Sequence, residues 1–294
     1  MGVGARQIPV ALRARVAHFD ANAFAQANDR RVTAWSAGVV FVAALIGGAI
    51  NSVSGGGTLI TFPTLIWTGM NPVIANATNT VALWPGSLAS LFGFRREFRT
   101  ATKRSRLLAL PSLMGGAAGA YLLINTPTKW FAAAVPYLIL GATILFAAQE
   151  LITRIAIGAS LDKIVDAAAG DASERGGWPT AFFFQLLVST YGGYFGAGIG
   201  ILMLAEFGLL GFTDIHHMIA LRNYLALCIN GVAAIYFVMR GAVSWPEAIL
   251  MTVAQVGGGY GGALVARRLS RRTVRWIVVG IGLAMAVSLF IAHK

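Results

Sequence analysis

The sequence predicts an all-α protein that crosses a membrane several times, and two observations carry this prediction. Hydrophobic residues make up 57% of the 294 residues, charged residues make up only 12%, and the mean hydropathy is +0.70. A water-soluble domain this apolar could not cover its surface with polar groups, so the apolar side chains must face lipid. Windows of about 20 largely uncharged residues also recur, which is the length that spans a hydrocarbon core.

Eight segments have the length and the composition of membrane spans. They are residues 33–53, 73–94, 107–125, 130–152, 178–204, 216–239, 243–266 and 274–292. Two shorter apolar pieces, 58–69 and 200–211, fit either a full crossing or a segment that enters and leaves on one side. The choice between eight and ten crossings, and with it the side of the termini, therefore stays open.

The chain divides into four parts. Residues 1–32 lack the apolar core of a signal peptide and are expected to form an N-terminal tail or an interfacial helix. Residues 33–152 and 178–294 are the first and second transmembrane repeats, and the polar residues 153–177 connect them. The single cysteine, Cys228, lies inside a span, so no disulfide forms within the chain.

The two halves resemble each other at a spacing of about 140 residues. The stretch "SVSGGGTLITF" (52–62) is echoed by "GYFGAGIGILM" (193–203), and "ANATNT" (75–80) falls opposite "MIALRN" (218–223). Interrupted helices at corresponding positions of two repeats are typical of a transporter's binding site. We favour inverted halves of about 4–5 segments each, because the two densest basic clusters then share the cytoplasmic side.

Basic residues outnumber acidic ones, with 23 Lys and Arg against 11 Asp and Glu and a formal charge of +12. In a soluble protein this excess would suggest a nucleic-acid partner. Here the clusters "RREFRTATKRSR" (95–106) and "RRLSRRTVR" (267–275) lie between spans, where Lys and Arg set topology and contact anionic lipid headgroups. We therefore expect membrane lipid, and no nucleic acid, as the partner of these clusters.

The stretch "NSVSGGGTLITFPTLIW" places three glycines directly after an apolar run. Non-helical backbone at membrane depth is tolerated only where it is buried in protein or lines a polar cavity. We therefore predict a break at Gly55, Gly56 and Gly57, after which a helix resumes near Thr58. The free N–H groups and the positive end of the dipole make such a helix start a ready site for an anion.

Gly196 and Gly198, in "GAGIGILML", predict a corresponding helix break in the second half, followed by a new helix N-terminus. Two helix N-termini that meet near the middle of the bilayer would form one cradle for an anion. The alternative is that the glycines only let helices pack closely. Close packing is the default for the small-residue spacings at 115–119 and 257–261.

Neutral polar residues flank the first break and begin the following span. They are Asn51, Ser54, Thr58, Asn76, Thr78 and Asn79. Their hydroxyl and amide groups suit two roles, which are capping helix ends and hydrogen bonding to the oxygens of a substrate. The sequence leaves both roles open.

Arg222 lies inside the span "HHMIALRNYLALCINGVAAIYFVM". An arginine there costs about 2.5–3.5 kcal/mol on insertion scales and should face a cavity or a partner. It attracts an anion, pairs with Glu206 or Asp214, or extends to the nearer interface. Asn223 and Asn230 continue a polar stripe on the same helix face.

Glu206, an acid within "LMLAEFGLLG", either binds a proton during coupling or neutralises Arg222. His216 and His217 are adjacent on a helix, so their side chains point about 100° apart and make a poor metal pair. We expect no metal site.

The pattern "NSVSGGGTLITFPTLIWTGMNPVIANATNTVALWPGSLASLFGFRR" resembles the first half of the sulfite exporter TauE/SafE family of membrane permeases. The stretch from "GGYFGAGIGIL" through "LRNYLALCINGVAAIYFVMRGAVSW" is similar to the family's second copy, and the resemblance covers roughly residues 35–290. It implies transport of sulfur-containing anions, such as sulfite or organosulfonates, in a direction that varies among members. The second copy departs from the pattern at "MIALRN" and "GILMLAEFG", where an alanine- and threonine-rich helix start and a proline are expected.

The sequence therefore predicts a secondary transporter of small anions such as sulfite, sulfoacetate or a taurine-like sulfonate, in a bacterial inner membrane. An anion channel is the first alternative. An intramembrane enzyme is the second, although the chain contains no H-E-x-x-H, G-x-S-x-G or Walker-type motif. We expect no cofactor. A coupling proton or cation and a homo-oligomer are both compatible with the sequence, which leaves the anion and the direction of transport open.

Overall fold

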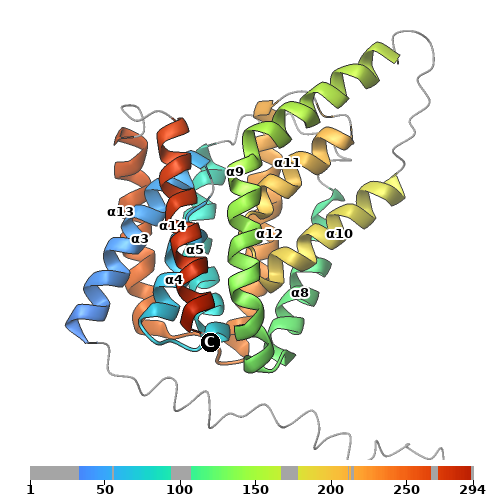
Figure 1. The fold of residues 1–294 in the computed structure, drawn as a ribbon. Coiled ribbons are helices and arrows are strands. Elements are labelled where there is room, and N and C mark those ends of the chain that lie inside the picture. Colours follow the sequence, from blue (N-terminus) through green and yellow to red (C-terminus); the bar gives the residue numbers. More distant parts are fainter. Residues whose placement is uncertain are drawn as a thin grey trace, which may run out of the picture. The chain divides into compact units, whose positions relative to one another are not determined.

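The computed structural model describes residues 33–54, 56–93, 107–166, 178–210, 212, 215–265 and 271–292. In this part of the chain the structure is helical and contains no strand (Figure 1). The helices are α3 (Ala34–Ser54), α4 (Thr58–Trp67), α5 (Pro72–Gly93), α8 (Ala109–Asn125), α9 (Thr128–Asp166), α10 (Trp178–Tyr194), α11 (Ile199–Leu209), α12 (Ile215–Met239), α13 (Trp245–Val265) and α14 (Arg271–Ala292). The tail expected at residues 1–32 lies outside the described residues.

Three of the described helices are long and apolar enough to cross a membrane, through Ala34–Asn51, Thr128–Ile152 and His217–Met239. Four shorter apolar helices accompany them, Thr58–Trp67, Ala109–Asn125, Ile199–Leu209 and Arg275–Ile291. Large apolar side chains are turned outwards, with Trp35, Met239 and Trp130 exposed by 82%, 78% and 74%. Such surfaces are stable against lipid and not against water, so the prediction of an integral, multi-pass, all-α membrane protein is confirmed.

The span expected at 178–204 is not continuous, because α10 ends at Tyr194 and α11 begins at Ile199. The break expected at Gly196 and Gly198 lies between these two helices. The span expected at 130–152 agrees with the apolar part of α9, Thr128–Ile152, and the helix continues to Asp166, so the first part of the polar segment 153–177 is helical. The two short apolar pieces that the sequence left undecided form α4 and α11.

The most extensive helix packings are those of α3 with α13 and of α8 with α10. Glycines allow both. A side chain at Gly48 would meet the backbone of Gln255, and one at Gly258 would meet the carbonyl of Leu45. Close packing without space for a Cβ is a common way for membrane helices to associate, since lipid tails are as apolar as the helices themselves.

The α8–α10 pair also packs through glycines, and buried hydrogen bonds join its two helices. A side chain at Gly119 would meet the carbonyl of Thr190. Beside this contact the buried Gln185 of α10 donates hydrogen bonds from Nε2 to Ser112 Oγ at 2.8 Å and to Ser189 Oγ at 3.0 Å. The glycines at 115–119 therefore pack helices together, as the default interpretation of their spacing predicts.

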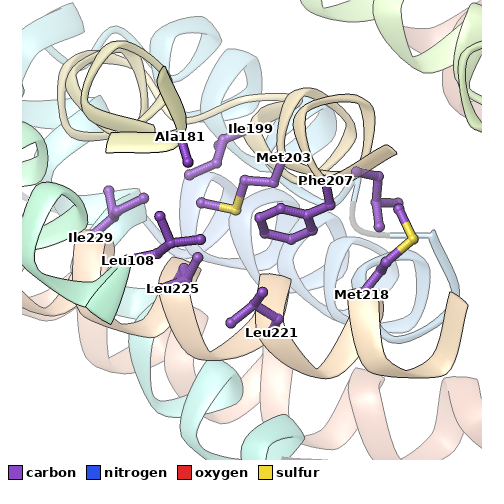
Figure 2. Close-up of a cluster of buried hydrophobic side chains, with 10 residues drawn as sticks. Leu108, Ala181, Ile199, Met203, Phe207, Met218, Leu221, Leu225 and Ile229 are labelled. Carbon is purple, nitrogen blue, oxygen red and sulfur yellow. The ribbon is translucent and has the colours of Figure 1, made fainter. Parts of the chain in front are cut away.

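The short helix α11 is held in place by a buried apolar cluster (Figure 2). Ile199, Met203 and Phe207 recur at a spacing of four residues and so share one face of the helix. Figure 2 shows this face directed at side chains of α12, among them Leu221 and Leu225. The cluster attaches α11 to α12 directly after the second interruption.

Substitution at Gly258 tests the α3–α13 packing. We expect Gly258→Ala to force the two helices apart and to lower the free energy of unfolding by about 1–3 kcal/mol, the usual cost of overpacking. Gly38→Ala on α3 is the matched control, because a Cβ there would meet nothing within 4 Å. It should leave stability unchanged or raise it by up to about 1 kcal/mol through helix propensity. Thermal unfolding in detergent measures both, and equal midpoints would contradict the packing described.

Candidate functional site

The first interruption lies between α3 and α4. Helix α4 begins at Thr58 with Gly57 as its N-cap, and Gly57 has ordinary right-handed dihedral angles, φ −57° and ψ −35°. The amide of Ile60 donates to the Gly57 carbonyl at 3.0 Å, which starts the new helix. A side chain at Gly57 would meet the carbonyl of Gly47 on α3. Glycine is therefore required here for close approach and not for an unusual backbone conformation.

The second interruption lies between α10 and α11 and has a different local cause. Gly196 and Gly198 both have φ +79°, in the left-handed region that side chains disfavour. A Cβ at Gly198 would meet no atom nearer than 3.8 Å, so space is not the constraint. The hydroxyl of Tyr191 donates to the Ala197 carbonyl at 2.7 Å, which supplies a partner for a backbone group freed by the break.

The two interruptions meet on one turn of α9. The Cβ position of Gly198 lies 3.8–3.9 Å from Leu145 and Ala142, and that of Gly56 points into the ring of Phe146. This turn lies inside the candidate span Thr128–Ile152. The breaks are also joined directly, because the rings of Phe62 in α4 and Phe195 pack edge to face with centroids 5.2 Å apart. Two helix N-termini therefore begin close together within the membrane region.

Buried amides and hydroxyls surround the first interruption. Thr61 Oγ1 donates to Asn79 Oδ1 at 2.6 Å and lies 3.1 Å from the Gly57 carbonyl. Asn76 Nδ2 donates to the Tyr194 carbonyl at 3.0 Å, which ties α5 to the second interruption. Thr61, Asn76 and Asn79 are each only 1% exposed. The polar groups at the start of α5 therefore connect both breaks.

Two polar side chains at the start of α5, Asn76 and Thr78, differ in their hydrogen bonds. Asn76 Oδ1 is buried and has no hydrogen-bond partner among the described residues. Thr78 Oγ1, by contrast, accepts a hydrogen bond from the backbone amide of Ser244 at 3.0 Å, beside the start of α13. Thr78 therefore holds the backbone at Ser244 by a hydrogen bond. Asn76 Oδ1, in contrast, has no partner among the described residues.

Arg222 lies beside the second interruption. Its Nε and Nη2 donate to Asn223 Oδ1 at 3.3 and 3.0 Å. Its side chain runs along α11 at Gly200, where a Cβ would lie 3.1 Å from Cδ and 3.5 Å from Nη1. The absence of a side chain at Gly200 thus makes room for the guanidinium at the first turn of α11.

The ion pair between Arg222 and Glu206 that the sequence offered as an alternative is not formed in the described part of the chain. Glu206 is 5% exposed, and both of its carboxylate oxygens are buried without a hydrogen-bond partner among the described residues. Asp214, the other partner considered for Arg222, lies outside the described residues. The charge on Arg222 is therefore met, within the described chain, only by the neutral amide of Asn223.

The remaining candidates lie at different distances from this centre. Asn51 packs against the first interruption, its Cβ 3.1 Å from the Cβ position of Gly57, and Thr58 is half-buried at the start of α4. Asn230 is half-buried on α12. Gly55 and the side chain of Ser54 lie outside the described residues. No group of three or more His, Cys, Asp or Glu side chains gathers within the described residues.

Thr61 was not among the residues predicted from the sequence. It lies inside the apolar run "LITF", where threonine is ordinary, and only its contact with Asn79, eighteen positions along the chain, shows its role. A usable signal was its position one helical turn after Gly57, on the same helix that begins at the break.

Comparison with known proteins places most of the chain in one group. Residues 40–289 match the family described as Sulfite exporter TauE/SafE. The chain is 28% identical to a probable membrane transporter protein, ORF9, of Sinorhizobium sp over 85% of its own length and 90% of the relative's. It is 27% identical to a probable membrane transporter protein of Haemophilus influenzae (85% and 93% covered), and 25% identical to the probable membrane transporter protein YfcA of Escherichia coli K12 (86% and 88% covered). The comparison with solved structures gives no significant match.

Substitution at Gly198 tests the left-handed backbone of the second interruption. We expect Gly198→Ala to lower the free energy of unfolding by about 1–2 kcal/mol, and Gly198→Asn to cost less, because asparagine tolerates this region. Gly141→Ala on α9 is the control, since a Cβ there meets nothing within 4 Å. Thermal unfolding of the purified protein measures all three. Equal losses for alanine at positions 141 and 198 would refute the assigned strain.

Proposed function

Because the chain belongs to the sulfite exporter TauE/SafE family, we propose that it is a secondary transporter of small sulfur-containing oxyanions or organosulfonates, such as sulfite, sulfoacetate or a taurine-like sulfonate. That it is a membrane transporter follows from the family and from its relatives, which carry the name of probable membrane transporter proteins. The class of anion and the mechanism, alternating access around the two helix breaks, are the proposal.

One observation carries the proposal, which is that both interruptions lie on the same turn of α9. The N-termini of α4 and α11 each bear the positive end of a helix dipole. Brought together within the protein, two such ends favour an anion between them through their dipoles. The amides of Leu59, Ile60 and Ile199 already donate to carbonyls of the breaks, so side chains must supply part of the anion's hydrogen bonds. A sulfonate or sulfite offers three oxygens to such a cradle.

The side chains around the cradle suit the same ligand. Arg222, beside Gly200, supplies the positive charge, and the buried amide of Asn79 and the hydroxyl of Thr61 supply neutral groups. Asn76 has one oxygen to spare, which suits a ligand that carries a hydrogen-bond donor, such as the ammonium group of a taurine-like sulfonate. We propose that the substrate site is formed by Asn51, Ser54, Gly55, Gly56, Gly57, Thr58, Asn76, Asn79, Gly196, Gly198, Arg222, Asn223 and Asn230, with Thr61 added and Thr78 in a supporting role.

We also propose that the two halves are inverted with respect to each other. The helix packings occur in exchanged pairs, in which α3 packs on α13 and α10 on α8, α5 packs on α13 and α12 on α8, and α4 packs on α14 and α11 on α9. In Figure 1, α9 and α14 lie side by side and run in opposite directions, and α3 ascends where its counterpart α10 descends. An inverted repeat would produce both features.

A binding screen on the purified protein tests the substrate class. We expect sulfite, sulfoacetate or taurine to raise the thermal unfolding temperature, because a ligand that binds the folded state stabilises it by mass action. Sulfate and a carboxylate of equal size serve as comparisons. If only the carboxylate stabilised the protein, it would be a transporter of another anion class. Large single-channel currents in a planar bilayer would instead identify an anion channel.

Arg222→Gln separates a role in anion binding from a structural role. We expect it to reduce substrate flux about tenfold or more while membrane abundance stays normal, because the guanidinium is the charge at the cradle and Asn223 needs no charged partner. Arg240→Gln is the matched control directly after the same helix, where Arg240 is exposed and stacks over Tyr236. Uptake into proteoliposomes measures both variants. Unchanged flux in Arg222→Gln would remove this residue from the site.

A further inference from the structure

We propose that Glu206 is the proton site of the transport cycle and that it moves a proton in the same direction as the anion. The inference rests on the proposed function, since it requires an anion site at the N-terminus of α11. Glu206 takes a proton from water on one side, crosses as the neutral carboxylic acid and returns the proton to water on the other side.

The burial of Glu206 without a partner is the first argument. The side chain is 5% exposed, and neither carboxylate oxygen has a hydrogen-bond partner among the described residues. A bare carboxylate in such surroundings is far too costly to persist, so the group holds a proton in this conformation. An acid that served only the structure would be paired or hydrogen-bonded.

Among the described side chains, the helices packed on α11 bring no cation to Glu206. They are α9, α10 and α12. From α10, Tyr191 bonds to the Ala197 carbonyl. From α12, Arg222 lies at Gly200 and bonds to Asn223. His217 stacks on Phe212, which in turn packs against Phe207 at the C-terminal end of α11.

Further titratable side chains described on these helices also leave Glu206 unpaired. The side chains of Arg154, Asp162, Lys163, Asp166 and His216 lie outside the described residues. On α9, Lys129 and Glu150 are exposed, and Tyr137 is 67% exposed with its ring against Phe290 of α14. Tyr194 packs against Phe131, and Tyr224 and Cys228 lie half-buried on α12. None of these groups donates a hydrogen bond to the Glu206 carboxylate.

The position of Glu206 on α11 links its proton to the anion. Seven residues separate it from Ile199, where the helix begins, which corresponds to about 10 Å along the axis. Two negative charges at that distance repel enough, at an effective dielectric constant of about 20, to weaken anion binding on the order of tenfold. The anion therefore binds best when Glu206 is neutral, and the two cross together.

Proteoliposomes with an imposed pH gradient test this proposal, with radiolabelled sulfoacetate and sulfite as the probes. Sulfoacetate is fully ionised near neutral pH, so a proton that crosses with it is not the substrate's own. We expect the wild-type protein to accumulate the anion on the alkaline side. Glu206→Gln should still exchange internal for external anion in the absence of a gradient but lose gradient-driven accumulation. Glu150→Gln, an exposed carboxylate paired with Arg275 at 2.7 Å, is the matched control and should accumulate normally.

The outcomes separate this inference from the proposed function. Accumulation by Glu206→Gln at the wild-type level, or loss of its exchange together with accumulation, would overturn the proton role. Absence of any anion exchange in the wild-type protein would overturn the proposed function itself.

Infrared spectroscopy of the purified protein tests the protonation of Glu206 without a transport assay. At neutral pH the wild-type protein should show the carbonyl band of a protonated carboxyl that is absent from Glu206→Gln, and its absence from the wild type would also refute the proposal.

Discussion

The constraint on which the structure depends is that backbone N–H and C=O groups inside a bilayer need partners within the protein. Two interruptions in the helical backbone would be intolerable if each stood alone against lipid. They are placed instead on one turn of α9, where Gly56 meets Phe146 and Gly198 meets Ala142 and Leu145. Each break is covered by protein, since Phe62 packs against Phe195 and the Tyr191 hydroxyl donates to the Ala197 carbonyl. Both breaks therefore pack against α9, the longest described helix.

The surrounding helices pack closely around the two breaks. The α3–α13 and α8–α10 pairs approach so closely that glycines are required at their crossings. Because each pair joins a helix of one half to a helix of the other, neither half can be removed without exposing the other's packing surface. The short helices α4 and α11 lie inside this frame, and the apolar cluster in Figure 2 attaches α11 to α12. A closely packed frame around two short helices is compatible with the movement that the proposed mechanism requires.

The sequence predicted the class of fold, the family and the two breaks, because clustered glycines weaken a helix in the surroundings where a bilayer otherwise favours one. It placed the second break at Gly196 and Gly198 but still gave 178–204 as one span, because the stretch "YFGAGIGIL" is as apolar as a continuous helix. The sequence did not show the cause of this break, which is the left-handed backbone at both glycines. Thr61 was missed for a related reason, since a hydroxyl in an apolar run shows no function until the fold brings it to Asn79. Side-chain partners across the structure are set by packing, which no local pattern encodes.

In the proposed repeat the two halves are alike in backbone and unlike in charge, and this difference bears on the proposed mechanism. In the alignment of the repeats Asn79 falls opposite Arg222, and extending the alignment of the two breaks places the fully buried Leu65 opposite Glu206. In the proposed site, the first half supplies neutral groups, and the second supplies one fixed positive charge and one acid. An anion bound there would be neutralised by the second half alone. If that half also gained or lost a proton, the charge of the loaded site would change without any change in the first half. In the proposed mechanism, a symmetric backbone would permit two equivalent openings, and the asymmetric side chains would decide what crosses with the anion.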